Sequence, residues 1–126
     1  MPQTILVVDD SLFSRKAAKK ALLPLGCELL EATNGQEALD FVAASEPDLV
    51  VTDLLMPVLD GVQFLAQLRG QGSMVPVIVA SADIQESTRS QCEALGINGF
   101  LNKPYKAEDL QVLAGAALGQ PQESLS

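Results

Sequence analysis

The sequence predicts an α/β fold in which helices cover both faces of a parallel β-sheet. Five short runs rich in Val, Ile, Leu and Ala alternate with five amphipathic segments along the 126 residues. The runs are apolar at nearly every position, which is typical of strands covered on both faces. Regular alternation of strands and helices is the pattern of a parallel sheet with helical crossovers. A chain of this length buries roughly two-thirds of its unfolded surface, so one core suffices.

The predicted strands are short, and in chain order they are Ile5–Val8, Leu29–Ala32, Leu49–Thr52, Val75–Ala80 and Gly99–Leu101. The predicted helices follow them one by one and are Leu12–Leu25, Gln36–Ser45, Gly61–Arg69, Ile84–Leu95 and Ala107–Leu118. We expect the domain to span residues 1–118. Residues 119–126 have no apolar periodicity and are predicted to form a flexible tail.

Residues with capping and turn preferences support the limits of these helices. Ser11 can accept a hydrogen bond at the start of the first helix, and Gly26 follows its last apolar residue. The pairs Asn34–Gly35 and Asp60–Gly61 indicate the entries into the second and third helices. Gly96 can end the fourth helix.

Apolar residues at helical spacing predict which face of each helix is buried. The stripe predicted for the first helix is Phe13, Ala17, Ala21, Leu22 and Leu25. The last helix has the most regular stripe, which begins at Leu110. The fourth helix has few apolar residues, so it is predicted to be the least firmly packed.

Right-handed crossovers leave few strand orders for this succession of elements. The favoured one is the flavodoxin-like order 2-1-3-4-5, a doubly wound (βα)5 three-layer sandwich. In this order the winding reverses between the first and third strands. Ligands of such sheets bind at the carboxyl ends of the strands near this reversal, so we expect a site there.

Composition excludes several kinds of chemistry. The chain has 8 Lys and Arg against 16 Asp and Glu, a net charge of −8, which argues against a broad basic face for nucleic acid. It has no histidine, which excludes a Ser-His-Asp triad and a His-liganded zinc site within the chain. Cys27 and Cys92 lie far apart and are predicted to be buried or half-buried thiols. Without a signal-peptide pattern or a membrane-length apolar run, we expect a cytoplasmic protein with no membrane partner.

Polar side chains follow four of the five predicted strands at the point where each strand ends. Asp9 and Asp10 follow the first strand, and Asp53 follows the third. Ser81 ends the fourth strand, and Lys103 follows the fifth. Three neighbouring carboxylates repel one another unless a divalent cation or a lysine neutralises them. Such a cluster, without a histidine base, suits phosphoryl transfer, in which an aspartate can itself become the acceptor.

Four segments of the chain carry a resemblance to a known family, and they are ILVVDDS, VVTDLLMPVLDG, VIVASA and GFLNKPY. In this order and spacing the chain resembles the receiver domain of two-component response regulators. The resemblance runs from about Thr4 to Leu118. The size of the chain is similar to that of the single-domain, chemotaxis-type members.

The resemblance implies a role for each acidic residue of the cluster. Asp53 would be the phosphoacceptor. Asp10 would bind Mg²⁺ directly, Asp9 would bind it mostly through water, and Asp53 and the backbone carbonyl of Leu55 would complete the protein ligands. Mn²⁺ is the expected substitute ion.

The resemblance also implies roles for the residues around the phosphoryl group. The Ser81 hydroxyl would hydrogen-bond to it, and Lys103 would pair with one of its oxygens. The Lys103–Pro104 peptide bond is expected to be cis. Phe100, three residues before Lys103, would move towards Ser81 on phosphorylation, although the family more often has tyrosine there. A plain core phenylalanine is the alternative.

Two further positions are expected to influence the lifetime of the phosphate. Leu55 lies two residues after Asp53, and Asp83 lies two residues after Ser81. Both are expected to flank the path of an attacking water molecule. Leu55 cannot orient water, whereas Asp83 could orient it or repel hydroxide. The alternative is that both are ordinary loop residues.

The resemblance implies a histidine kinase or a histidine phosphotransfer protein as one partner and an unidentified downstream protein as another. The docking residues are expected to be Phe13, Ser14, Lys16 and Lys19 on the first helix, with Tyr105 nearby, and Arg89, Phe100, Asn102 and Tyr105 on the output face. The alternative for the basic residues is a solvated helix face. We expect a monomer or a weak dimer that forms on phosphorylation.

The predicted function is a stand-alone regulator that signals through altered protein binding, rather than an enzyme, although it catalyses its own phosphorylation and dephosphorylation. A phosphorelay intermediate or phosphate sink is the alternative. An aspartate-nucleophile phosphatase of the haloacid-dehalogenase type needs a second aspartate two residues after the first. Leu55 and Ser11 occupy that position after Asp53 and Asp9, which disfavours this class. The complete cluster also disfavours a degenerate receiver that is not phosphorylated.

Overall fold

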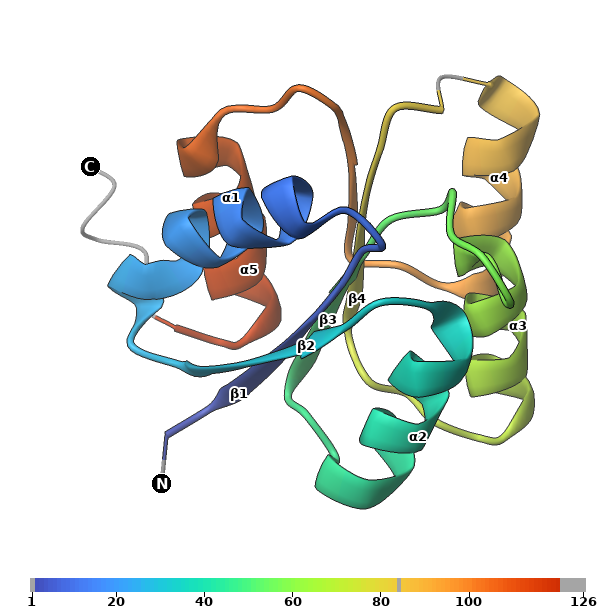
Figure 1. Ribbon diagram of the computed structural model, residues 1–126, viewed down its shortest axis with the longest axis horizontal. Helices are drawn as coiled ribbons and strands as arrows, with labels where there is room; N and C mark the ends of the chain where they lie inside the picture. Colours follow the sequence, from blue (N-terminus) through green and yellow to red (C-terminus); the bar gives the residue numbers. More distant parts are fainter. Residues whose placement is uncertain (1, 84, 121–126) are drawn as a thin grey trace.

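The computed structural model describes residues 2–83 and 85–120 and shows a parallel sheet between two layers of helices (Figure 1). The strand order is β2-β1-β3-β4-β5, so the predicted fold class is confirmed. The strands are β1 Thr4–Val8, β2 Glu28–Ala32, β3 Leu49–Thr52, β4 Val77–Ser81 and β5 Gly99–Asn102. The helices are α1 Leu12–Leu22, η1 Leu23–Leu25, α2 Gly35–Ser45, α3 Gly61–Gly70, α4 Glu86–Leu95 and α5 Ala107–Ala117. No helix among these residues is long and apolar enough to cross a membrane.

The core forms two clusters, one on each face of the sheet. Ile5 and Val7 point to the face covered by α1 and α5, whereas Leu6 and Val8 point to the face covered by α2, α3 and α4 (Figure 1). This alternation follows from the strand period of two. Both faces are apolar, which explains the nearly continuous apolar runs in the sequence.

The strand register brings the ends of β1 and β3 level with each other. Val8 pairs with Ala32 of β2 and with Thr52 of β3. The N–H of Asp53 donates to the Val8 carbonyl at 3.0 Å, and the N–H of Asp9 donates to the Ala32 carbonyl at 3.0 Å. Asp9 and Asp53 therefore leave the sheet side by side.

The helix limits follow the local chemistry. The side chains of Ser11, Asn34 and Asp60 each accept a backbone N–H at the start of α1, α2 and α3. The first helix ends at Leu22 rather than continuing to residue 25, because Pro24 lacks the N–H that a further turn would need. A short 3₁₀ turn replaces it.

The buried face of α1 differs from the predicted stripe. Ala18, Ala21 and Leu22 are buried, whereas Phe13 is 83% exposed. The sequence holds two overlapping stripes that share Ala21 and Leu22, and packing against the sheet and α5 selects the one through Ala18. Phe13 and Ala17 lie on a neighbouring face and line a surface groove.

The fourth helix is packed lightly, as predicted. Cys92 is its single buried residue, and no side chain caps its start at Gln85. Ile84, which was predicted to begin this helix, lies outside the described residues. At the other end, the Arg69 guanidinium donates to the carbonyls of Leu95 and Gly96. The helix is thus held more firmly at its carboxyl end.

Only part of the predicted tail can be compared with the structure, because residues 121–126 lie outside the described part of the chain. Gln120 is placed, and its side-chain amide donates to Gln3 at 2.9 Å and to the Leu25 carbonyl at 3.3 Å. These bonds tie the end of α5 to the start of β1.

The loop after β3 contains a strained turn that provides a stability prediction. Val58 has a φ of 68°, and the N–H of Leu59 donates to the Pro57 carbonyl at 2.7 Å. A β-branched residue is disfavoured in this left-handed region. Val58 is 80% exposed, so replacing it by glycine relieves this strain without loss of packing. The energy gained in the folded state exceeds the stabilisation of the unfolded chain by the added conformational entropy of glycine. We expect the free energy of unfolding to rise by about 1 kcal/mol.

Urea titration of Val58→Gly and Val112→Gly measures this effect. Val112 is partly exposed within α5, where glycine is unfavourable, so this control should be less stable than the parent protein. Equal losses of stability in the two variants would contradict the assignment of strain to Val58.

Candidate functional site

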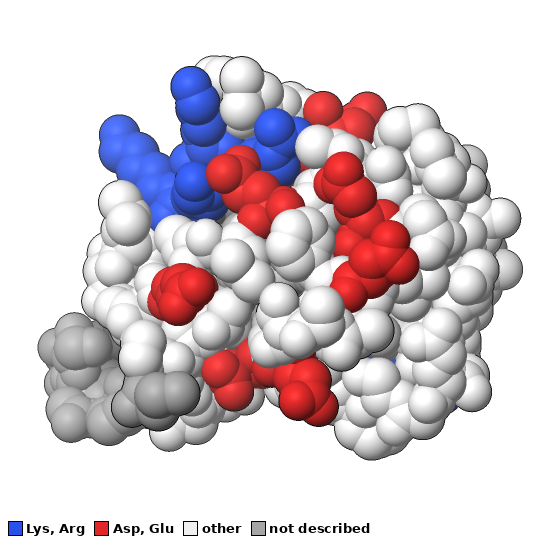
Figure 2. All heavy atoms as spheres, turned by 60° about the horizontal axis from the view of Figure 1, so that its bottom comes forward, with Lys and Arg blue, Asp and Glu red and all other residues white. Residues whose placement is uncertain are grey.

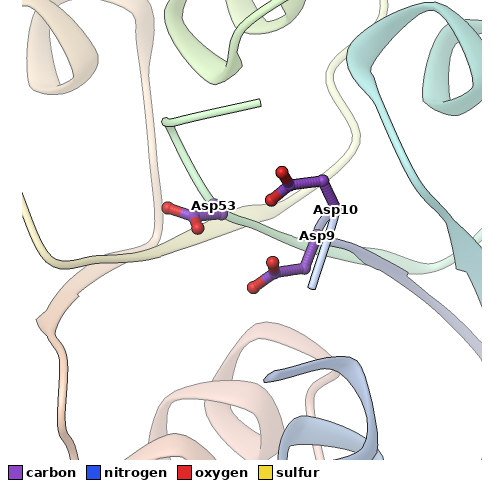
Figure 3. Close-up of side chains that lie close together, drawn as sticks. All are labelled: Asp9, Asp10 and Asp53. Atoms are coloured by element: carbon purple, nitrogen blue, oxygen red, sulfur yellow. The ribbon is translucent and has the colours of Figure 1, made fainter. Parts of the chain in front are cut away.

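Three carboxylates gather where β1 and β3 leave the sheet. Asp9, Asp10 and Asp53 each offer an oxygen atom, and these oxygens lie within 4.8 Å of one another (Figure 3). Asp9 and Asp53 are nearly buried, with 8% and 11% of their side chains exposed. Asp10 is exposed to solvent. The predicted meeting of these three residues is therefore present in the fold.

Lys103, which directly follows the edge strand β5, connects two of these acids. Its Nζ donates to Asp9 Oδ2 at 2.8 Å and to Asp53 Oδ2 at 3.1 Å. Burial alone lowers the pKa of Lys103, but the hydrogen bond from Lys103 to Asp9 and the charge of Asp53 outweigh it, so the pKa lies above its ordinary value. The lysine therefore remains charged at neutral pH.

Backbone N–H groups fix the remaining oxygens of the buried acids. Asp53 Oδ1 accepts the N–H of Leu54 at 2.6 Å and that of Leu55 at 3.4 Å. Asp9 Oδ1 accepts the N–H of Ser11 at 2.9 Å. Within the described residues, no hydrogen bond or ion pair engages the Asp10 carboxylate. Asp10 is thus the acid most available to a cation from solvent.

Ser81 and Lys103 reach the site from neighbouring strands. Ser81 pairs with Asn102 across β4 and β5, and the N–H of Lys103 donates to the Ser81 carbonyl at 2.9 Å. Ser81 is fully buried, and its hydroxyl accepts the N–H of Asp83 at 3.2 Å. No hydrogen bond joins this hydroxyl to Asp53 within the described residues. The Lys103–Pro104 bond is cis, as the resemblance implies.

The positions expected to affect phosphate lifetime lie in two loops. Leu55 is 61% exposed and lies two residues after Asp53 in the loop after β3. Asp83 is partly buried, and its Oδ1 accepts the N–H of Gln85 at 2.9 Å. Asp83 is therefore already engaged in ordering the start of the loop before α4.

Phe100 lies in β5 opposite Val79 and packs partly buried against the core. The Arg89 guanidinium lies over its ring, 5.4 Å from the centroid. Arg89 also pairs with Glu93 at 3.3 Å. Phe100 thus has a polar neighbour on α4 that was not expected from the sequence.

The residues expected to dock partners divide into two surfaces. The first is a groove of about 500 Å³ between α1 and the loop after β5, and Phe13, Ser14, Lys103, Pro104 and Tyr105 contribute to it. The second is a smaller hollow of about 190 Å³, to which Asp83, Arg89, Phe100 and Asn102 contribute. Tyr105, expected on both surfaces, lines the first one.

The basic residues of α1 are placed differently from one another. Lys16 is exposed, whereas Lys19 pairs with Glu31 of β2 at 2.9 Å. Figure 2 shows Lys and Arg side chains gathered at one corner of the face in view, with Asp and Glu spread over the rest. The basic surface of α1, formed by Arg15, Lys16, Lys19 and Lys20, thus contrasts with the net charge of −8 of the whole chain.

The arrangement is compatible with phosphoryl transfer, which depends on positioning and charge neutralisation. One carboxylate is oriented by two N–H groups and a lysine, and hard oxygen ligands suited to a divalent cation lie beside it. The site therefore combines an oriented carboxylate, a lysine and oxygen ligands at the carboxyl edge of a small doubly wound domain.

Comparison with known proteins identifies the family. The family model of the response regulator receiver domain matches residues 5–114. The chain belongs to this family, so it is a receiver domain of the two-component response regulators.

Sequence relatives carry the same description. The chain is 39% identical over 110 residues to "Response regulator MprA" of Mycolicibacterium vanbaalenii and 38% identical over 110 residues to that of Mycobacterium tuberculosis. Each match covers 87% of this chain but only 48% of the relative. The chain therefore spans about half the length of these curated relatives.

Solved structures agree with the fold and the family. The receiver domain of NarL from M. tuberculosis is 28% identical, with a TM-score of 0.85 over 94% of this chain and 98% of that one. The chemotaxis response regulator CheY4 of Vibrio cholerae is also 28% identical, with a TM-score of 0.83 over 94% and 100%. The receiver domain of sensor histidine kinase PA1611 from Pseudomonas aeruginosa, solved with magnesium in its active site cleft, has 28% identity and a TM-score of 0.84 over 95% and 100%.

These relatives leave two expectations unsupported. Because the MprA sequences are about twice as long as the match, a stand-alone role and the absence of a nucleic-acid partner both stay predictions. Resemblance to the chemotaxis-type members likewise concerns the fold and family rather than a pathway.

Proposed function

We propose that this receiver takes a phosphoryl group from a histidine kinase or a histidine phosphotransfer protein onto Asp53 and signals through altered binding to another protein. Receiver domains of this family are signalling domains that interact with histidine kinases and catalyse their own phosphorylation. The observation that carries the proposal is the position of Asp53, whose Oδ2 faces Lys103 at 3.1 Å within the carboxylate cluster. Cys27 and Cys92 are free thiols, which supports a reducing compartment such as the cytoplasm.

In the proposed reaction, Asp53, Lys103 and Ser81 each have a separate role. An Asp53 carboxylate oxygen attacks phosphorus, a P–O bond forms, and the P–N bond to the donor histidine breaks. Lys103 moves from the carboxylate to a phosphoryl oxygen and offsets its charge. The Ser81 hydroxyl turns from the Asp83 N–H and donates to another phosphoryl oxygen.

The ligand chemistry fits Mg²⁺, which the family binds in an acidic pocket. We propose that Asp10 and Asp53 hold the ion directly with the Leu55 carbonyl, that Asp9 acts through water, and that Mn²⁺ can substitute. When bound, the ion neutralises the acids and the phosphoryl oxygens. Oxygen ligands and an exposed Asp10 support this assignment.

Phosphorylation is proposed to act on α4 and β5. Withdrawal of the Ser81 hydroxyl towards the phosphoryl group leaves room for the ring of Phe100. The light packing of α4, with Cys92 as its single buried residue, supports a shift of this helix. The hollow beside Arg89 and Asn102 would then change shape and alter partner binding.

The phosphate lifetime provides a prediction for Leu55. Asparagine in place of this exposed leucine can hydrogen-bond to water beside Asp53, so we expect Leu55→Asn to change the self-dephosphorylation rate several-fold. Loss of radiolabel from the purified phosphoprotein measures the rate. The matched control is Met74→Asn, an exposed residue before β4 at the opposite edge of the sheet. Equal decay in both variants and the parent protein would contradict the role of Leu55.

The basic surface of α1 provides a prediction about the phosphodonor. Charge reversal of both Lys16 and Lys19 to glutamate should slow transfer from the cognate kinase at least several-fold, because an acidic partner would be repelled. Acetyl phosphate needs no docking surface, so its reaction rate should fall much less than transfer from the kinase, and the remaining fall reports the lost ion pair between Lys19 and Glu31. Unaltered transfer from the kinase would count against docking on α1.

Transfer from histidine donors tests the proposal and separates it from the relay and the sink. Purified kinases and phosphotransfer proteins, labelled on histidine, are mixed with the receiver, and the label on the receiver is followed with time. Persistent label that changes binding to another protein supports a regulator. Label that moves to a second histidine protein supports a relay, and label lost at once as free phosphate supports a sink. Absence of transfer from every donor would contradict all three.

A further inference from the structure

Arg15 of α1 connects the carboxylate cluster to β2, although its charge was not assigned to the site from the sequence. Its Nη1 donates to the backbone carbonyl of Asp9 at 2.7 Å, and its Nε donates to Glu31 Oε1 at 3.0 Å. Only 12% of its side chain is exposed. Such a guanidinium is held in place rather than free in solvent.

The contact completes the hydrogen bonding of Asp9. The N–H of this residue donates to Ala32, its Oδ1 accepts Ser11, and its Oδ2 accepts Lys103. The carbonyl oxygen, held by Arg15, belongs to the peptide plane that leads into Asp10. Arg15 therefore fixes the orientation of the backbone from which the Asp10 side chain projects.

Glu31 holds the guanidinium in the orientation that this contact needs. Hydrogen bonds from Lys19 and from Arg15 lower the pKa of Glu31, so its carboxylate stays charged. The planar guanidinium can bond the Glu31 carboxylate and the Asp9 carbonyl at once in a fixed geometry, which a lysine ammonium cannot reproduce. The ion pair also offsets a positive charge that would otherwise repel a cation in the cluster.

We infer that Arg15 is a positioning residue for the divalent-cation site and that it raises the Mg²⁺ affinity of the carboxylate cluster by fixing the Asp9–Asp10 peptide. The inference rests on the proposed function, which assigns Mg²⁺ to this cluster. Groups that orient metal ligands typically affect affinity by about 10-fold or more. If Arg15 acted only through its charge, its removal would instead raise the Mg²⁺ affinity, because loss of a nearby positive charge favours cation binding.

Magnesium titrations of the full chain show whether the loss of Arg15 lowers or raises the Mg²⁺ affinity. Binding is followed by NMR amide shifts or calorimetry, without a phosphodonor. Arg15→Lys and Arg15→Met should both bind Mg²⁺ about 10-fold more weakly than the parent protein, and Glu31→Gln should show a smaller loss. Lys20→Met removes a charge from an exposed position of the same helix and should bind like the parent. Thermal unfolding in EDTA checks that each variant is folded.

Each outcome bears on a different claim. Weaker binding by Arg15→Lys in a folded protein supports positioning, because this variant keeps the charge and loses the guanidinium geometry. Parent-like affinity in Arg15→Lys and Arg15→Met, or tighter binding by Arg15→Met, overturns the inference while the Mg²⁺ site stands. Absence of Mg²⁺ binding by the parent protein overturns the metal assignment itself.

Discussion

Lys103→Met is expected to slow phosphorylation by acetyl phosphate about 100-fold, the largest effect on activity of any change outside Asp53. Within the described residues, Lys103 is the one cationic side chain that pairs with the carboxylates of both Asp9 and Asp53. Methionine fills similar space without a charge, so no positive charge from the chain offsets the negative charge on the phosphoryl oxygens in the transition state. Intact mass against time measures the rate.

The same change should also reduce stability in the absence of metal. Two nearly buried carboxylates lose their common partner, which costs about 1–3 kcal/mol in free energy of unfolding. Added Mg²⁺ should restore part of that loss, because a cation can replace the lost charge. Lys106→Met, at an exposed position just before α5, is the control. Phosphorylation of Lys103→Met at the rate of this control would refute the role of Lys103.

Gly61→Ala is expected to have the largest effect on stability among small substitutions near the site. A Cβ at Gly61 would lie against the Asp53 carbonyl oxygen and 2.7 Å from the Cα of Leu54. Both atoms belong to the backbone, so the clash cannot be relieved by turning a side chain. We expect a loss of about 2–3 kcal/mol in urea unfolding and slower phosphorylation, since the backbone of Asp53 must move.

Gly70→Ala is the matched control for this prediction. Gly70 ends the same helix, and a Cβ there would meet no atom within 4 Å. Alanine should be neutral or slightly stabilising at this position. Equal free energies of unfolding in the two variants would show that the fold does not depend on the close approach of Gly61 to the backbone of Asp53 and Leu54.

The sequence was sufficient to predict the sheet and the acidic edge because both depend on short-range patterns. Continuous apolar runs identify the strands, and the strand order then places Asp9 and Asp53 together. Lys103 follows the last strand, and its approach to the same acids is a consequence of the same topology.

Other features depend on packing that no local pattern specifies. The exposure of Phe13 results from a choice between two stripes of α1 that share Ala21 and Leu22. The bond from Arg15 to the Asp9 carbonyl spans a helix and a strand end, and a helical arginine has no sequence signal for such a contact. The ring contact between Arg89 and Phe100 likewise joins two elements that only the fold brings together.

The central claim is that Asp53 accepts a phosphoryl group, and intact mass spectrometry after incubation with acetyl phosphate and Mg²⁺ tests it most directly. The parent protein should gain the mass of one phosphoryl group, and EDTA should prevent the gain. Asp53→Asn, which keeps the size of the side chain and removes the nucleophile, should gain none. An unchanged mass of the parent protein, or the same gain in Asp53→Asn, would contradict the account.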